Sequence, residues 1–85
     1  MSLTKSQENY INDLAKTHGE DYKTVFIASM SCLVCLGQMP EDNPTKKYLR
    51  KVTFILADFA SRQVGTDIET LIEKIQEFKR LGNLS

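Results

Sequence analysis

The chain has no excess of charge of either sign, because eleven Lys and Arg residues balance eleven Asp and Glu residues. A protein whose main role is to wrap nucleic acid is expected to carry a clear basic excess. The composition therefore argues against that class, although it leaves room for a local basic patch. With 85 residues, the chain is expected to form a single helical domain, residues 1–85. A domain of that size buries only about 60–65% of its unfolded surface, so its stability margin is small.

Catalytic and metal-binding motifs are also absent. The sequence contains no glycine-rich phosphate loop, no His-Glu-x-x-His motif and no calcium-binding loop. The single histidine, His18, has no nucleophile predicted beside it. Cys32 and Cys35 have C-x-x-C spacing, but they fall in the middle of an apolar segment and not at a helix N-terminus, where the dipole would stabilise a thiolate. A symmetric dimer could combine two such pairs into a zinc site of four thiolates, but we expect core packing. The sequence thus predicts no enzyme, no cofactor and no metal.

Export and membrane signals are missing as well. The N-terminal residues MSLTKSQENY lack the apolar core of a signal peptide. The uncharged run Thr24–Met39 spans sixteen residues, whereas a transmembrane helix needs about 20 predominantly apolar ones. We therefore expect a cytoplasmic protein with reduced thiols and no membrane partner.

That uncharged run is the most unusual feature that is present. Its apolar residues point in every direction around a helix, and such a helix has to be covered on all sides. The sequence predicts either a central helix wrapped by the rest of the chain or a face shared with a second subunit. Ala28, Cys32 and Cys35 recur at helical spacing on one side, where their small size would let another helix approach. This row is the predicted oligomer interface, within the chain or in a homodimer.

Start and stop signals divide the chain into four helices. A Thr4–Gln7 capping box opens the first helix, which ends near Thr17 or His18 before Gly19. The second is expected from about Tyr22 to Leu36. The third follows an Asn43-Pro44 start and continues to Gln63 or Val64. A second capping box, Thr66–Glu69 with Thr66 as its cap, opens a fourth helix that ends at Gly82. No segment alternates like a strand. Short connections predict an all-α fold, a small antiparallel four-helix bundle with a highly apolar second helix.

The third helix carries an apolar stripe, which we expect to face the core. Its members recur at helical spacing: Tyr48, Leu49, Val52, Ile55, Leu56, Phe59 and Ala60. Phe54 lies about 160° from the centre of this stripe on a helical wheel, so it is predicted to be a surface aromatic among charged residues.

Four cations, Lys46, Lys47, Arg50 and Lys51, gather at the start of the same helix, where the helix dipole disfavours them. Nearby acids such as Glu41 would offset this cost. The alternative is a surface for anions or an acidic partner. Arginine and aromatic residues dominate binding hot spots. The predicted partner-binding surface comprises Lys47, Arg50, Lys51, Phe54 and Asp58.

These patterns favour a non-enzymatic protein-interaction module. It would act as an adaptor, regulator or inhibitor of a larger protein partner, and as a homodimer. By analogy, its size and lack of catalytic groups are also typical of phage or mobile-element accessory proteins. The alternative is a dimeric nucleic-acid-binding regulator that uses the basic start of the third helix. A third class, an enzyme or small-ligand binder, has no motif in its favour.

Overall fold

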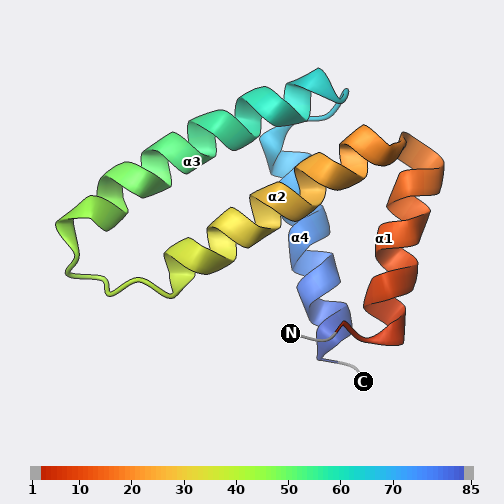
Figure 1. The fold of residues 1–85 in the computed structure, drawn as a ribbon, viewed down its shortest axis with the longest axis horizontal. Helices are drawn as coiled ribbons and strands as arrows, with labels where there is room; N and C mark the ends of the chain where they lie inside the picture. Colours follow the sequence, from red (N-terminus) through yellow and green to blue (C-terminus); the bar gives the residue numbers. More distant parts are fainter. Residues whose placement is uncertain (1–2, 84–85) are drawn as a thin grey trace.

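The computed structural model describes residues 3–83, which form four helices and, within that range, no strand (Figure 1). The helices are α1 (Lys5–His18), α2 (Glu20–Gly37), α3 (Pro44–Gln63) and α4 (Ile68–Gly82). The predicted all-α class and the number of helices are confirmed. Only the start of α2 differs noticeably, because it begins two residues before the expected Tyr22.

Local side-chain caps explain where α1 and α3 begin. The Thr4 hydroxyl accepts a hydrogen bond from the Gln7 backbone N–H (3.1 Å), and the Gln7 side chain accepts one from the Thr4 N–H (3.1 Å). This is the predicted capping box. At α3, the Asn43 side chain accepts from the Thr45 N–H (2.9 Å), and Pro44 occupies the first helical position. Both helix starts are therefore fixed by residues adjacent in sequence.

The cap of α4 is one residue later than predicted. The Asp67 carboxylate, and not Thr66, accepts a hydrogen bond from the Thr70 N–H (2.8 Å). Hydrogen bonds from the Thr70 backbone and side chain hold the pKa of Asp67 below its usual range. A carboxylate in this position satisfies a free N–H and also complements the helix dipole.

The helices form two pairs that cross steeply. In Figure 1, α2 and α3 run antiparallel along one another, while α1 and α4 lie across one end of that pair. The C-terminal half of α2, the connecting loop and the N-terminal half of α3 project beyond α1 and α4 as an arm. The radius of gyration, 13.5 Å, accordingly exceeds the roughly 12 Å expected for a compact chain of this length. Four aligned axes, as in a simple bundle, are not seen.

The core lies where the two pairs cross. Rings from three helices meet there: the centroid of Phe26 in α2 is 6.1 Å from that of Tyr10 in α1 and 5.7 Å from that of Phe78 in α4. The Gln7 side chain also donates a hydrogen bond to the Phe78 carbonyl (3.1 Å), which ties α1 to the end of α4. The buried cluster consists of Ile11, Leu14, Tyr22, Phe26, Ala57, Ile68, Leu71, Ile75 and Phe78.

The second helix is central but only partly covered. It contacts each of the other three helices, yet its buried residues are limited to Tyr22, Phe26, Ser29 and Leu36. The cysteines, Cys32 and Cys35, are exposed, so the expectation that both pack in the core is wrong. The reason is geometric: α1 and α4 cross α2 steeply instead of running along it (Figure 1), and a hollow lined by Cys35, Phe78 and Lys79 remains between the C-terminal half of α2 and the end of α4.

The position of the α4 cap leads to a first prediction. Asp67→Ala should lower the melting temperature by several degrees, because it removes the cap, whereas Thr66→Ala should have a much smaller effect. Since the pKa of Asp67 is lowered on folding, its contribution is present above the unfolded-state pKa of about 3.9 and is lost as the pH falls through the folded-state value. Thermal unfolding followed by circular dichroism from pH 2 to 7 checks both points. Equal effects of the two alanine variants would contradict this assignment of the cap.

Candidate protein-interaction surface

The third helix turns its bulkiest apolar side chains toward solvent. Tyr48, Ile55, Leu56 and Phe59 are 63–67% exposed, and Val52 is 51% exposed. Their spacing places them on one side of the helix, the same stripe that the sequence assigned to the core. That assignment is wrong. We call Tyr48, Leu49, Val52, Ile55, Leu56 and Phe59 the α3 apolar face.

The opposite side of α3 is the one that packs against the rest of the chain. Ala57 and Ser61 are buried there, and Thr53 and Ala60 are partly buried. Helices whose contact residues are small can approach closely, so this side suits packing against α2 and α4. Periodicity alone shows that a helix has an apolar side, but it does not reveal whether the same chain covers it. In this helix two sides are suited to packing, and the chain covers only one.

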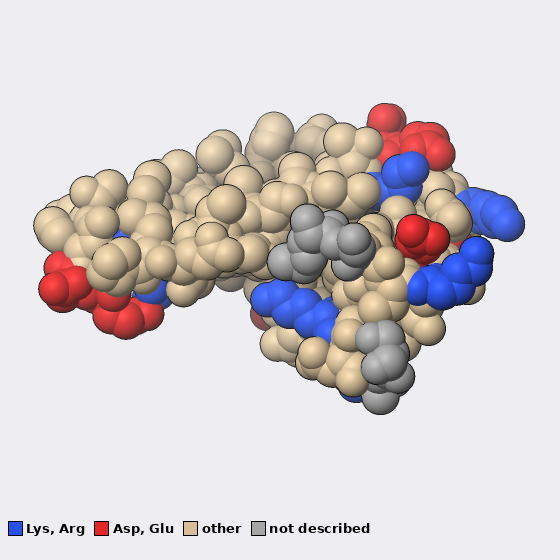
Figure 2. All heavy atoms as spheres, turned by 60° about the horizontal axis from the view of Figure 1, so that its bottom comes forward, with Lys and Arg blue, Asp and Glu red and all other residues tan. Residues whose placement is uncertain are grey.

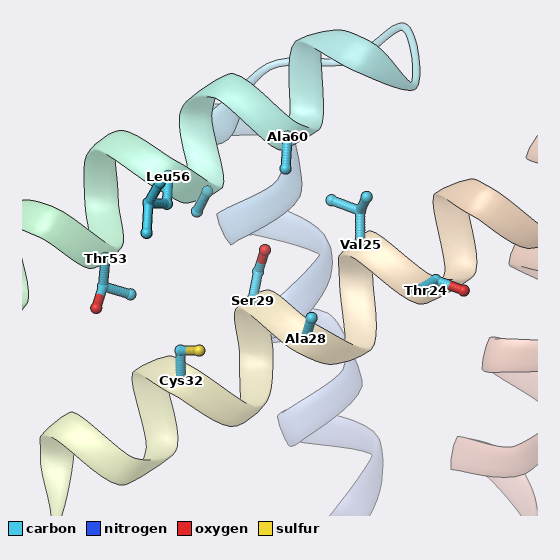
Figure 3. Close-up of a pocket in the computed structure, with 9 residues that line it drawn as sticks. Thr24, Val25, Ala28, Ser29, Cys32, Thr53, Leu56 and Ala60 are labelled. Atoms are coloured by element: carbon cyan, nitrogen blue, oxygen red, sulfur yellow. The ribbon is translucent and has the colours of Figure 1, made fainter.

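A groove runs between α2 and α3, next to the α3 apolar face. Its volume is about 250 Å³ and its lining is almost wholly apolar. Figure 3 shows the small side chains of Ala28, Ser29 and Cys32 on α2 across from Leu56 and Ala60 on α3. The groove remains because these small side chains do not fill the space between the helices.

A second hollow continues this surface along the arm. Cys32 and Cys35 of α2 line it together with Leu49 of α3. The predicted oligomer interface, Ala28, Cys32 and Cys35, is therefore exposed and borders the α3 apolar face. Figure 2 shows a broad uncharged surface along the arm, between acids at its tip and the charges around α1 and α4.

Two members of the basic cluster lie close to one acid of the chain. Lys46 is 4% exposed. Its Nζ donates to the Met39 carbonyl (2.9 Å) and forms an ion pair with Glu41 (2.5 Å). Arg50 approaches the same carboxylate, at 3.9 Å. The hydrogen bond and charge of Lys46 hold the pKa of Glu41 below its usual range. Glu41 thus pairs mainly with Lys46 and only distantly with Arg50, in line with the expectation that nearby acids lower the cost of the cluster.

Sequence reasoning did not distinguish Lys46 from its neighbours. The only available signal is its place on the helical wheel, on the same side as Thr53 and Ala57, which pack against α2. Lys47 and Lys51 are exposed and form no ion pair within the described part of the chain.

The predicted partner-binding residues lie along one edge of the α3 apolar face. Phe54 is half exposed and lines a shallow hollow with Arg50 and Lys51. Asp58 is partly buried and pairs with Arg62 (3.4 Å). The structure thus brings these residues together as a polar margin with one aromatic, next to a much larger apolar surface.

Residues 3–83 contain no metal-binding cluster. His18 stacks on Tyr22 with ring centroids 4.3 Å apart, and no group of three or more His, Cys, Asp or Glu residues in this range could hold a metal ion. No helix in the described range is both long and apolar enough to cross a membrane. Comparisons with protein families, characterised proteins and solved structures find nothing that matches this chain. The proposed function therefore rests on the exposed surfaces of α2 and α3.

The Lys46–Glu41 pair leads to a second prediction. Glu41→Gln should lower the melting temperature by several degrees, because it leaves the buried Lys46 ammonium facing a neutral amide. Asp42→Asn, a matched change at the next residue, should have little effect. Because the pKa of Glu41 is lowered on folding, the advantage of wild type over Glu41→Gln is present above the unfolded-state pKa of about 4.3 and disappears as the pH falls through the folded-state value. Melting curves of the three proteins between pH 2 and 7 test this. A difference that persists at the lowest pH would rule out the ion pair as its cause.

Proposed function

We propose that this chain is a non-enzymatic protein-interaction module that acts in the cytoplasm by binding a protein through the α3 apolar face. It would serve as an adaptor, a regulator or an inhibitor. The observation that carries the proposal is the exposure of six large apolar side chains on one side of a single helix.

The size of the exposed surface supports this function. If a large side chain offers about 200 Å², six that are 40–67% exposed present on the order of 700 Å². The largest apolar patch on a typical monomer is about 300–600 Å², and a larger one usually marks a binding site. The α3 apolar face exceeds that range before the adjoining part of α2 is added.

The composition of the surface also fits a protein interface. Its centre is apolar and includes two aromatic rings, Tyr48 and Phe59, a residue class that often anchors interfaces. Its margin is charged, with Lys51, Asp58 and Arg62 along one edge. An apolar centre with a polar rim is the usual anatomy of such contacts. The highly apolar α2 extends the centre through its row of small residues.

The nucleic-acid alternative draws less support. Glu41 pairs closely with the buried Lys46 and lies 3.9 Å from the exposed Arg50, in a chain of zero net charge. The three exposed cations of the cluster, Lys47, Arg50 and Lys51, offer little of the phosphate neutralisation on which such binding depends.

Site-specific photocrosslinking in the cells that express the chain tests the proposal. A photoreactive residue at Val52 should give a discrete protein adduct, because its side chain would lie inside the contact. The same residue at Glu69, exposed on α4, is the matched control and should give none. Phe59→Ser should remove the Val52 adduct without changing the helical content of the free protein, because Phe59 is 64% exposed.

Two results would refute the proposed function. One is the absence of any adduct specific to the α3 apolar face. The other is an equal yield of the same adduct from Val52 and from Glu69, since this would indicate random collisions.

A further inference from the structure

We propose that the occupant of the α3 apolar face is a second copy of this chain, packed antiparallel to it about a twofold axis that crosses the face at the level of residues 53 and 54. The inference rests on the proposed function and names the protein that occupies this face. A larger protein regulated by the dimer would then bind outside this face, where Lys47, Arg50 and Phe54 are exposed. The resulting dimer would join two α2–α3 pairs into an antiparallel four-helix arrangement shared between the copies.

Four residues of the α3 apolar face, which we call the seam, show the same spacing and the same residue classes when they are read from either end. Tyr48, Val52, Ile55 and Phe59 follow one another at spacings of four, three and four residues, the spacing of a helix–helix seam. Reversed about the midpoint between residues 53 and 54, Val52 exchanges with Ile55 and Tyr48 with Phe59. A twofold-symmetric interface requires such a match, because residue i meets residue j and j meets i.

The seam is also closed by polar residues at both ends. The next positions in the same pattern are Thr45 and Arg62, which exchange with each other under the same reversal. The seam therefore contains four apolar layers between two polar ones, and its length matches the apolar part of the helix.

The charges beside the seam favour the antiparallel orientation. Lys51 and Asp58 lie on the same edge, seven residues apart, and in an antiparallel pair each edge faces the same edge of the other copy. With the axis at residues 53 and 54, Lys51 comes within about 3 Å along the helix axis of the second copy's Asp58, and symmetry repeats the pair. Within the described residues, Asp58 forms one ion pair, with Arg62, and Lys51 forms none.

The other edge is apolar in the same symmetric way. Leu49 of one copy comes within about 3 Å along the helix axis of Leu56 of the second copy, and this edge borders the groove and the exposed row Ala28, Cys32 and Cys35 of α2. A parallel pair would instead place Lys51 and Asp58 against the leucine edge. The predicted oligomer row thus extends the contact, with α3 at its centre.

The available area suits a stable dimer. The α3 apolar face offers on the order of 700 Å² per copy by the estimate above, and a standard protein–protein interface uses about 800 Å² per partner. The bordering residues of α2 can supply the difference.

Charge reversal tests the pairing. Lys51→Glu alone and Asp58→Lys alone should each raise the dimer dissociation constant about tenfold at low salt, because each turns two attractions into repulsions. The double variant restores opposite charges and should recover most of the affinity. Lys16→Glu, with the same change in net charge on α1, is the control and should have no effect. Sedimentation velocity over a concentration series measures all four.

Spin labels test the orientation. In a Cys32→Ser, Cys35→Ser background, labels at Gln63 of the two copies should lie about 28 Å apart along the helix axis, whereas labels at Phe54, on the outer side of each helix, should be almost level and separated only across the width of the pair. Double electron–electron resonance measures both distances. A short distance between the Gln63 labels would indicate a parallel pair and overturn the inference.

The outcomes separate this inference from the proposed function. A Val52 adduct with the mass of two chains, together with rescue by the double variant, supports both. A purified protein that stays monomeric at high concentration while Val52 still captures a different protein overturns only the dimer. A dimer that survives Ile55→Asp with unchanged affinity also overturns it, and Ile55 is exposed enough that this variant should fold.

Discussion

The structure depends on how α3 divides its surface between the chain's own helices and solvent. Its small residues, Ala57 and Ser61 among them, pack against the chain's own helices, and its large residues face outward. The four helices of residues 3–83 leave one side of α3 and part of α2 uncovered. Most of α1 and α4 packs around the core at Phe26 and Phe78, so one side of the arm stays exposed. Burial of apolar area drives both folding and association, and in the proposed dimer the two processes would share a single helix.

Local features were predictable from the sequence because they depend on neighbours along the chain. The Thr4–Gln7 capping box and the Asn43-Pro44 start both lie where expected. The α4 cap was displaced by one residue, to Asp67, because Thr66 and Asp67 are both competent caps and the sequence does not decide between them. Hydrophobic spacing likewise identified the correct side of α3 as apolar.

Long-range features were not predictable, because spacing does not say which surface covers an apolar stripe. The sequence placed Ile55 and Phe59 in the core, and the structure exposes them. It placed Cys32 and Cys35 in the core too, although α1 and α4 do not extend far enough along α2 to cover them. The converse holds for Lys46, which the sequence places in a charged cluster but which is buried by the packing of α3. These differences have one cause: the α1–α4 pair crosses the α2–α3 pair steeply, so the four helices do not share one direction. The proposed dimer would supply the aligned antiparallel arrangement between two chains.

Hydroxyl-radical footprinting of the purified protein tests the central claim most directly, because it reports the solvent exposure of individual aromatic side chains. The account predicts that Tyr48 and Phe59 are oxidised slowly at high protein concentration and faster on dilution, while Phe54, outside the seam, reacts at a constant rate. Rapid oxidation of Tyr48 and Phe59 at every concentration, in keeping with their 67% and 64% exposure in the single chain, would contradict it.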